Sequence, residues 1–188
     1  GLNELRRMGA RVDGGKLYLA IEGFVEAGNT VVGYIDTDPG NAEHGLALQD
    51  LRDEGDPGDL DDSLCGALAL SPELLAAGVR PDVAFGVRGQ GRTDGANPGR
   101  LAGWRRLSRA DDLGWIAGEL VTGPQSLEAT IDLTTLYGVE AAQLPASGRL
   151  AIFVRLTNDN GASYSNMELP QQDGVSNPVT RYEEVVWP

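Results

Sequence analysis

The segment Asp36-Thr37-Asp38-Pro39-Gly40-Asn41 contains oxygen ligands at a spacing that suits a hard cation. Alternate aspartates followed by glycine and asparagine can fold their oxygens around one ion, and calcium takes roughly six to eight oxygen ligands. Further acids follow in the same stretch of chain, although the spacing of an EF-hand is missing. We therefore predict a calcium site formed by Asp36, Asp38, Asn41, Asp59 and Asp61. The alternative is that the two aspartates of the segment form an Asx-turn without metal.

Aromatic residues with arginine or asparagine close by form a second group that could bind a ligand. Aromatic rings stack on the apolar faces of sugars, while arginine and asparagine side chains hydrogen-bond to sugar hydroxyls. We predict a carbohydrate site formed by Trp104, Arg105, Trp115, Tyr164 and Asn166. The alternative is that at least one tryptophan belongs to the core, because large aromatic side chains dominate protein cores.

Cysteine and histidine contribute little chemistry, since Cys65 and His44 are each the only residue of their type. No disulfide can form within the chain, and no cysteine cluster can hold zinc or iron–sulfur. No serine lies in a Gly-x-Ser-x-Gly nucleophile motif. No pair of carboxylates stands out for acid–base catalysis, so we expect a protein that is not an enzyme.

Length and charge set the class of protein. A chain of 188 residues can form one sizeable core, so we expect a single domain over residues 1–188. The net charge of −13 argues against nucleic acid as a partner, and no apolar run approaches the roughly 20 residues of a membrane span. An acidic chain with one cysteine, one lysine and a first residue other than methionine predicts a processed protein that is secreted or at the cell surface.

Strand signals dominate the elements that must position these residues. Apolar residues alternate in four segments, as in strands with one buried face: 17–22, 83–87, 127–133 and 150–156. The apolar run 31–35 predicts a central strand covered on both faces. We expect antiparallel hairpins with the following spans: 3–12 with 17–22, 17–36, and 101–107 with 113–121. Residues 179–187 are expected to close the sheet.

Helical signals are few and short. Ser71, Pro72 and Gly78 mark the start and end of one helical turn, and residues 133–138 predict another, capped by Thr134. A third is expected within residues 46–51. Together, the strand and helix signals predict an all-β protein, an antiparallel β-sandwich of jelly-roll type with a few helical turns in loops. They also predict a long acidic loop insertion at about 40–80.

A family resemblance rests on five segments: 17–23, 31–40, 126–138, 155–158 and 165–170. Their order resembles that in DOMON-like and family-nine carbohydrate-binding-like β-sandwich domains of secreted bacterial surface proteins. The resemblance implies a surface-exposed module that binds sugar between two facing tryptophans, for which Trp104 and Trp115 are the candidates.

Two functions follow as expectations. The first is a non-catalytic extracellular module that binds a polysaccharide or surface glycan and is stabilised by calcium. The second is a structural subunit of a cell surface, appendage or matrix that assembles through strand edges, with the terminal segments 1–12 and 179–188 as the exchanged elements.

Overall fold

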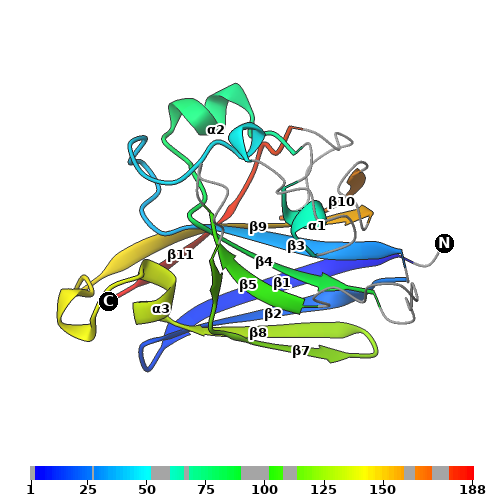
Figure 1. The fold of residues 1–188 in the computed structure, drawn as a ribbon, viewed down its shortest axis with the longest axis horizontal. Coiled ribbons are helices and arrows are strands. Elements are labelled where there is room, and N and C mark those ends of the chain that lie inside the picture. The colour runs from blue at the N-terminus through cyan, green and yellow to red at the C-terminus, as the bar shows by residue number, and fades with distance from the viewer. Residues whose placement is uncertain are drawn as a thin grey trace.

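The computed structural model describes most of the chain in eight segments: 3–26, 28–51, 60–65, 68–89, 102–107, 114–158, 164–170 and 178–188. Of position 61 and positions 164–168 it describes the backbone alone. The described residues form two antiparallel sheets that pack face to face (Figure 1). The expected all-β sandwich is confirmed at this level.

The first sheet, sheet A, has four strands in the order β1-β2-β8-β7. Their bounds are β1 Glu4–Asp13, β2 Lys16–Phe24, β7 Glu119–Gly123 and β8 Ser126–Asp132. The turn between β1 and β2 consists of Gly14 and Gly15, which have φ values of 56° and 77°. Two consecutive residues at positive φ fit a tight hairpin and favour glycine, so the expected hairpin of residues 3–12 with 17–22 is confirmed.

The second sheet, sheet B, has the order β10-β9-β3-β4-β5-β6, and β11 pairs with the remaining length of β9. Its strands are β3 Asn29–Asp36, β4 Val83–Arg88, β5 Ala102–Arg106, β6 Trp115–Ile116, β9 Gly148–Asn158, β10 Tyr164–Leu169 and β11 Glu183–Trp187. Both terminal strands therefore pair within the chain, β1 with β2 and β11 with β9.

Five short helical turns lie among the described connections: η1 Leu48–Asp50, α1 Leu60–Leu64, α2 Pro72–Ala76, α3 Leu133–Tyr137 and η2 Ala141–Gln143. Ser71 caps α2 as expected, because its side chain accepts a hydrogen bond from the backbone N–H of Leu74. Gly138 ends α3 in the left-handed conformation, with a φ of 68°. The residue before α3 is Asp132, so Thr134 lies inside the helix and the expectation that it caps the helix was wrong.

Sheet B is covered on both faces, by two separate cores. The first core lies between the sheets and contains the alternating apolar residues of sheet A. The second lies on the outer face of sheet B, under α1, α2 and the connections around them (Figure 1). There Tyr34 stacks on Phe153, with ring centroids 5.2 Å apart. These two layers confirm that β3 is a central strand with both faces buried.

One expectation about the pairing of the strands was wrong. Residues 17–36 do not form a hairpin, since β2 pairs with β1 and β8 while β3 pairs with β4 and β9 in the other sheet. The leucines in the described part of the segment 40–80 form much of the second core. Where the chain is described, no helix has the length and apolar character of a membrane span.

Candidate metal site

Three carboxylates meet where β3 ends and β4 begins. Asp36 is the last residue of β3, Asp38 lies two residues further on, and Asp82 directly precedes β4. The two strands are antiparallel and pair Ile35 with Val83, so the residues just beyond these partners lie at the same end of the sheet. One oxygen from each of the three carboxylates lies within 4.8 Å of the other two.

Backbone hydrogen bonds hold two of the carboxylates in place. Asp36 is 1% exposed. Its Oδ1 accepts from the N–H of Asp38 at 3.0 Å and its Oδ2 from the N–H of Arg80 at 2.7 Å. Asp82 Oδ2 accepts from both the N–H and the hydroxyl of Thr37, each at 2.8 Å. The hydrogen bond from the N–H of Asp38 to Asp36 Oδ1 closes an Asx-turn. This is the turn that the sequence offered as the alternative to a metal site, and here the turn and the carboxylate cluster occur together.

Asp38 has one oxygen that is satisfied and one that is not. Its Oδ2 accepts from the amide of Asn41 at 2.9 Å and lies 2.7 Å from Nδ1 of His44. Its Oδ1 is buried and has no hydrogen-bond partner among the described residues. A buried acceptor without a partner costs free energy, and a cation held by the three carboxylates would supply the missing partner.

The loop that carries Asp38 is fixed to the chain before β4 by close backbone contacts. Gly40 N–H donates to Gly78 O at 3.2 Å, and Leu46 N–H donates to Pro81 O at 3.0 Å. Gly45 has a φ of 67°, and a Cβ there would overlap the carbonyl of Arg80. Glycine is therefore required at this point for the loop to approach the residues that precede Asp82.

Burial makes the cluster hard to ionise completely. Desolvation raises the pKa of Asp36 from 3.8 to about 7, and the charges of Asp82 and Asp38 add to the effect against the two backbone hydrogen bonds. Desolvation also raises the pKa of Asp82 against the two hydrogen bonds from Thr37, and the charge of Asp38 adds to the increase while that of Arg106 opposes it. Near neutral pH the cluster is therefore suited to hold either a proton or a cation.

The structure supports only part of the predicted metal site. It brings Asp36 and Asp38 together as expected. Asn41 lies beside the cluster and is engaged in hydrogen bonds: its amide donates to Asp38, and its Oδ1 accepts from the N–H of Glu43 at 3.1 Å. Asp59 and the side chain of Asp61 lie outside the described residues. The third carboxylate, Asp82, was missed, and the pairing of β3 with β4 is the signal that would have revealed it.

The predicted carbohydrate residues do not form one site. Trp104 is 1% exposed and packs against Phe85 in the core between the sheets, which is the alternative considered for one tryptophan. Arg105, which is also buried, pairs with Trp115, and its guanidinium lies 5.1 Å from the centre of that ring. Because neighbouring residues of a strand point to opposite faces, Trp104 and Trp115 lie on opposite faces of sheet B and do not face each other.

The remaining two predicted residues belong to a distant strand. Tyr164 and Asn166 lie in β10, and three strands separate β10 from β5. At about 4.8 Å between neighbouring strands, that places their backbone roughly 19 Å from Trp104. Their side chains are outside the described part of the structure. The backbone geometry thus separates the predicted site into two parts.

Comparisons with protein-family models, with curated proteins and with solved structures found no match. The resemblance to DOMON-like and family-nine carbohydrate-binding-like domains therefore stays a prediction.

Proposed function

We propose that this protein is a non-catalytic β-sandwich module of jelly-roll type in which Asp36, Asp38 and Asp82 bind a calcium ion. The observation that carries the proposal is the buried Asp38 Oδ1 without a hydrogen-bond partner, in a cluster where three carboxylate oxygens lie within 4.8 Å of one another. The hydrogen bonds that Asp36 and Asp82 accept from backbone N–H groups support a structural rather than a catalytic role.

The donor set favours a hard cation. All three groups offer carboxylate oxygen, and no cysteine lies with them in the cluster. Calcium accepts carboxylates, backbone carbonyls and water in a flexible arrangement, so the other ligands need not be side chains. Bound there, the ion would neutralise part of the charge of the cluster and fix the loop 37–45 against residues 78–82.

The test is thermal unfolding of the purified protein in chelator, in calcium and in magnesium. A ligand that binds only the folded state adds about 2.7 kcal/mol at a free concentration roughly 100 times its Kd. For a chain of 188 residues this corresponds to a rise in Tm of about 5–10 °C. An equal Tm in calcium and in chelator would overturn the proposal, and a larger rise in magnesium would assign the site to that ion.

Carbohydrate binding is the second part of the proposal, and it now depends on Trp115. This side chain is half-buried and stacks with Arg105, whereas Trp104 is unavailable to a ligand. We expect retardation of the protein in gels that contain a bound polysaccharide, and loss of retardation in Trp115→Ala. Equal migration of the parent protein across a broad panel of polysaccharides would end this part of the proposal and leave the calcium site untouched.

The alternative of a structural subunit assembled by strand exchange has less support, because β1 and β11 already pair within the chain. We place the module outside the cell or on its surface, a proposal supported by its acidic composition and single cysteine. Recovery of the protein solely from the cytosolic fraction of its native cells would contradict that location.

A further inference from the structure

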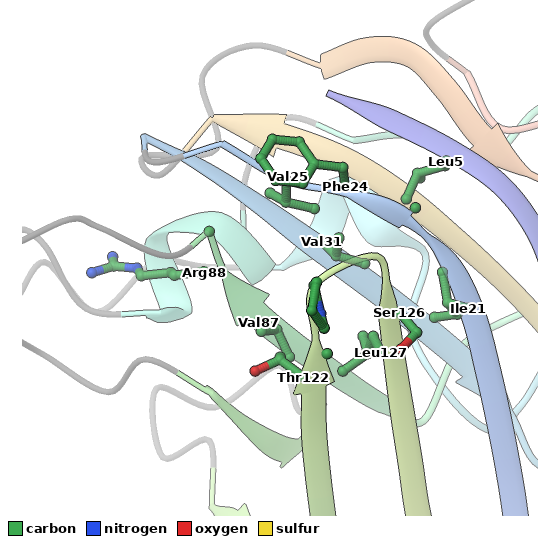
Figure 2. Close-up of a pocket in the computed structure, with 14 residues that line it drawn as sticks. Leu5, Ile21, Phe24, Val25, Val31, Val87, Arg88, Thr122, Ser126 and Leu127 are labelled. Carbon is green, nitrogen blue, oxygen red and sulfur yellow. The ribbon is translucent and has the colours of Figure 1, made fainter. Parts of the chain in front are cut away.

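A pocket of about 270 Å³ opens between the two sheets, at the end of β3 opposite to Asp36 (Figure 2). Both sheets contribute to its wall. Five of the apolar side chains that line it are buried: Leu5, Ile21, Val31, Val87 and Leu127. All five also belong to the core between the sheets, so the pocket is a part of the sandwich interior that the chain does not fill.

The rim of the pocket is fixed by backbone contacts. Gly23 N–H donates to Gln125 O at 3.0 Å, and Gly89 N–H donates to Asn29 O at 2.8 Å. A Cβ at Gly23 would overlap the carbonyl of Glu4, and one at Gly89 would overlap that of Glu26. The absence of side chains at these two glycines thus lets the rim segments approach closely, and the pocket exists before any ligand arrives.

The pocket is accessible from solvent. Thr122 pairs with Leu127 across β7 and β8, so both side chains point to the interior face of sheet A. Leu127 is 5% exposed, whereas Thr122 is exposed. Because Thr122 faces the interior and is still exposed, the space between the sheets is open to solvent beside Thr122. Phe24 lies on the rim and is 38% exposed.

No charge points into the pocket from the described lining residues. Arg88 is the one charged residue among them, and its guanidinium points away from the others in Figure 2. The polar side-chain groups that remain are the hydroxyls of Thr122 and Ser126. Water in such a pocket would find few of the two to four partners it needs, so an apolar molecule is the favoured occupant.

We propose that this pocket binds a neutral, mainly apolar small molecule of about ten carbon atoms that carries one hydroxyl or carbonyl group. A cavity of about 150 Å³ lined by aliphatic and aromatic side chains holds benzene, so about 270 Å³ accommodates a molecule nearly twice that size. The apolar part of the ligand replaces water against Val31, Val87 and Leu127. Its polar group reaches the hydroxyl of Thr122 at the rim.

The test is isothermal titration of the whole protein with α-naphthol, a neutral probe of this size. Thr122→Phe places a ring in the opening without removing any core atom. Val121→Phe is the matched control, because Val121 is the preceding residue of the same strand, is 60% exposed and faces away from the pocket. We expect saturable binding of one naphthol, a loss of at least about tenfold in affinity in Thr122→Phe, and no change in Val121→Phe.

Three results would overturn the proposal. They are the absence of saturable binding to the parent protein, equal binding by Thr122→Phe, and equal loss in Val121→Phe. A separate titration tests whether the pocket prefers a neutral ligand to a charged one. α-Naphthoate has the same rings and a negative charge, and we expect it to bind at least about tenfold more weakly than α-naphthol. Equal affinity for the two probes would refute the claim that the pocket selects neutral molecules.

Discussion

The substitution Asp82→Asn separates the role of Asp82 in hydrogen bonding from its role as a charge. A single oxygen, Oδ2, accepts both hydrogen bonds from Thr37. The amide oxygen of asparagine can therefore replace it without losing either bond. The amide nitrogen then takes the position of Oδ1, from which it can donate toward the carboxylates of Asp36 and Asp38. The substitution thus removes one negative charge and one metal ligand while it preserves the local hydrogen bonds.

The expected effect has opposite signs without and with calcium. A pKa of Asp36 raised from 3.8 to about 7 corresponds to about 4 kcal/mol of stability, present at low pH and lost as the pH rises through this interval. Desolvation is the largest cause of that shift, and the charge of Asp82 comes fourth. We therefore expect Asp82→Asn to recover about 1 kcal/mol of this loss at pH 8 in chelator. In calcium the variant should lack most of the stabilisation of the parent protein.

Urea unfolding at pH 5 and pH 8, in chelator and in calcium, measures each of these quantities. Glu43→Gln is the matched control, because it removes the same charge from an exposed residue of the loop that carries Asp38, outside the cluster. Equal stability of the parent protein at both pH values in chelator would refute the reasoning from the pKa of Asp36. Destabilisation by Asp82→Asn in both media, with an unchanged response to calcium, would show that Asp82 is not a ligand of the ion and that its charge acts only by strengthening the hydrogen bonds from Thr37.

Two further substitutions test the contacts that fix the site and the second core. Tyr34→Phe removes a buried hydroxyl that donates to Leu64 O at 2.7 Å. We expect the free energy of unfolding, measured in urea, to fall by about 1–2 kcal/mol. An unchanged urea midpoint would argue against the contact of β3 with α1. Gly45→Ala introduces a Cβ at positive φ that would overlap the carbonyl of Arg80, so the Tm should fall and the response to calcium should weaken. A full calcium response in Gly45→Ala would mean that the loop does not position Asp38.

The sequence predicts the strands well because alternation of apolar residues is a local signal. β2 and β8 have buried residues at every second position, as their sequences indicate. Pairing is not a local property. A connection of four residues, 25–28, leads from β2 in one sheet to β3 in the other. Gly28 at its end and Asn29 at the start of β3 look the same in the sequence as the residues of a hairpin turn. The hairpin expected over residues 17–36 was wrong for this reason.

Because strand pairing is not visible in the local sequence, one residue of the metal cluster was missed and the two tryptophans were placed in one site. Asp36 and Asp38 are neighbours in the sequence and were found, whereas Asp82 joins them only through the pairing of β3 with β4. Alternation places Trp104 and Arg105 on opposite faces of one strand, but whether a face is buried depends on the layer that covers it. Here both faces of sheet B are covered, and the second core that covers the outer face arises from leucines placed among acidic residues.

The two proposed sites lie at opposite ends of β3 and should act independently. Val31 lines the pocket and Asp36 belongs to the acidic cluster, and five residues of extended chain separate them by about 17 Å. β3 pairs with β4 and β9 along its length and is buried on both faces, so it has no second arrangement through which one site could bias the other. We therefore expect the Kd for α-naphthol to be the same within about twofold in calcium and in chelator. A larger difference would show that β3 moves when calcium binds, and the sandwich interior would then have to rearrange with it.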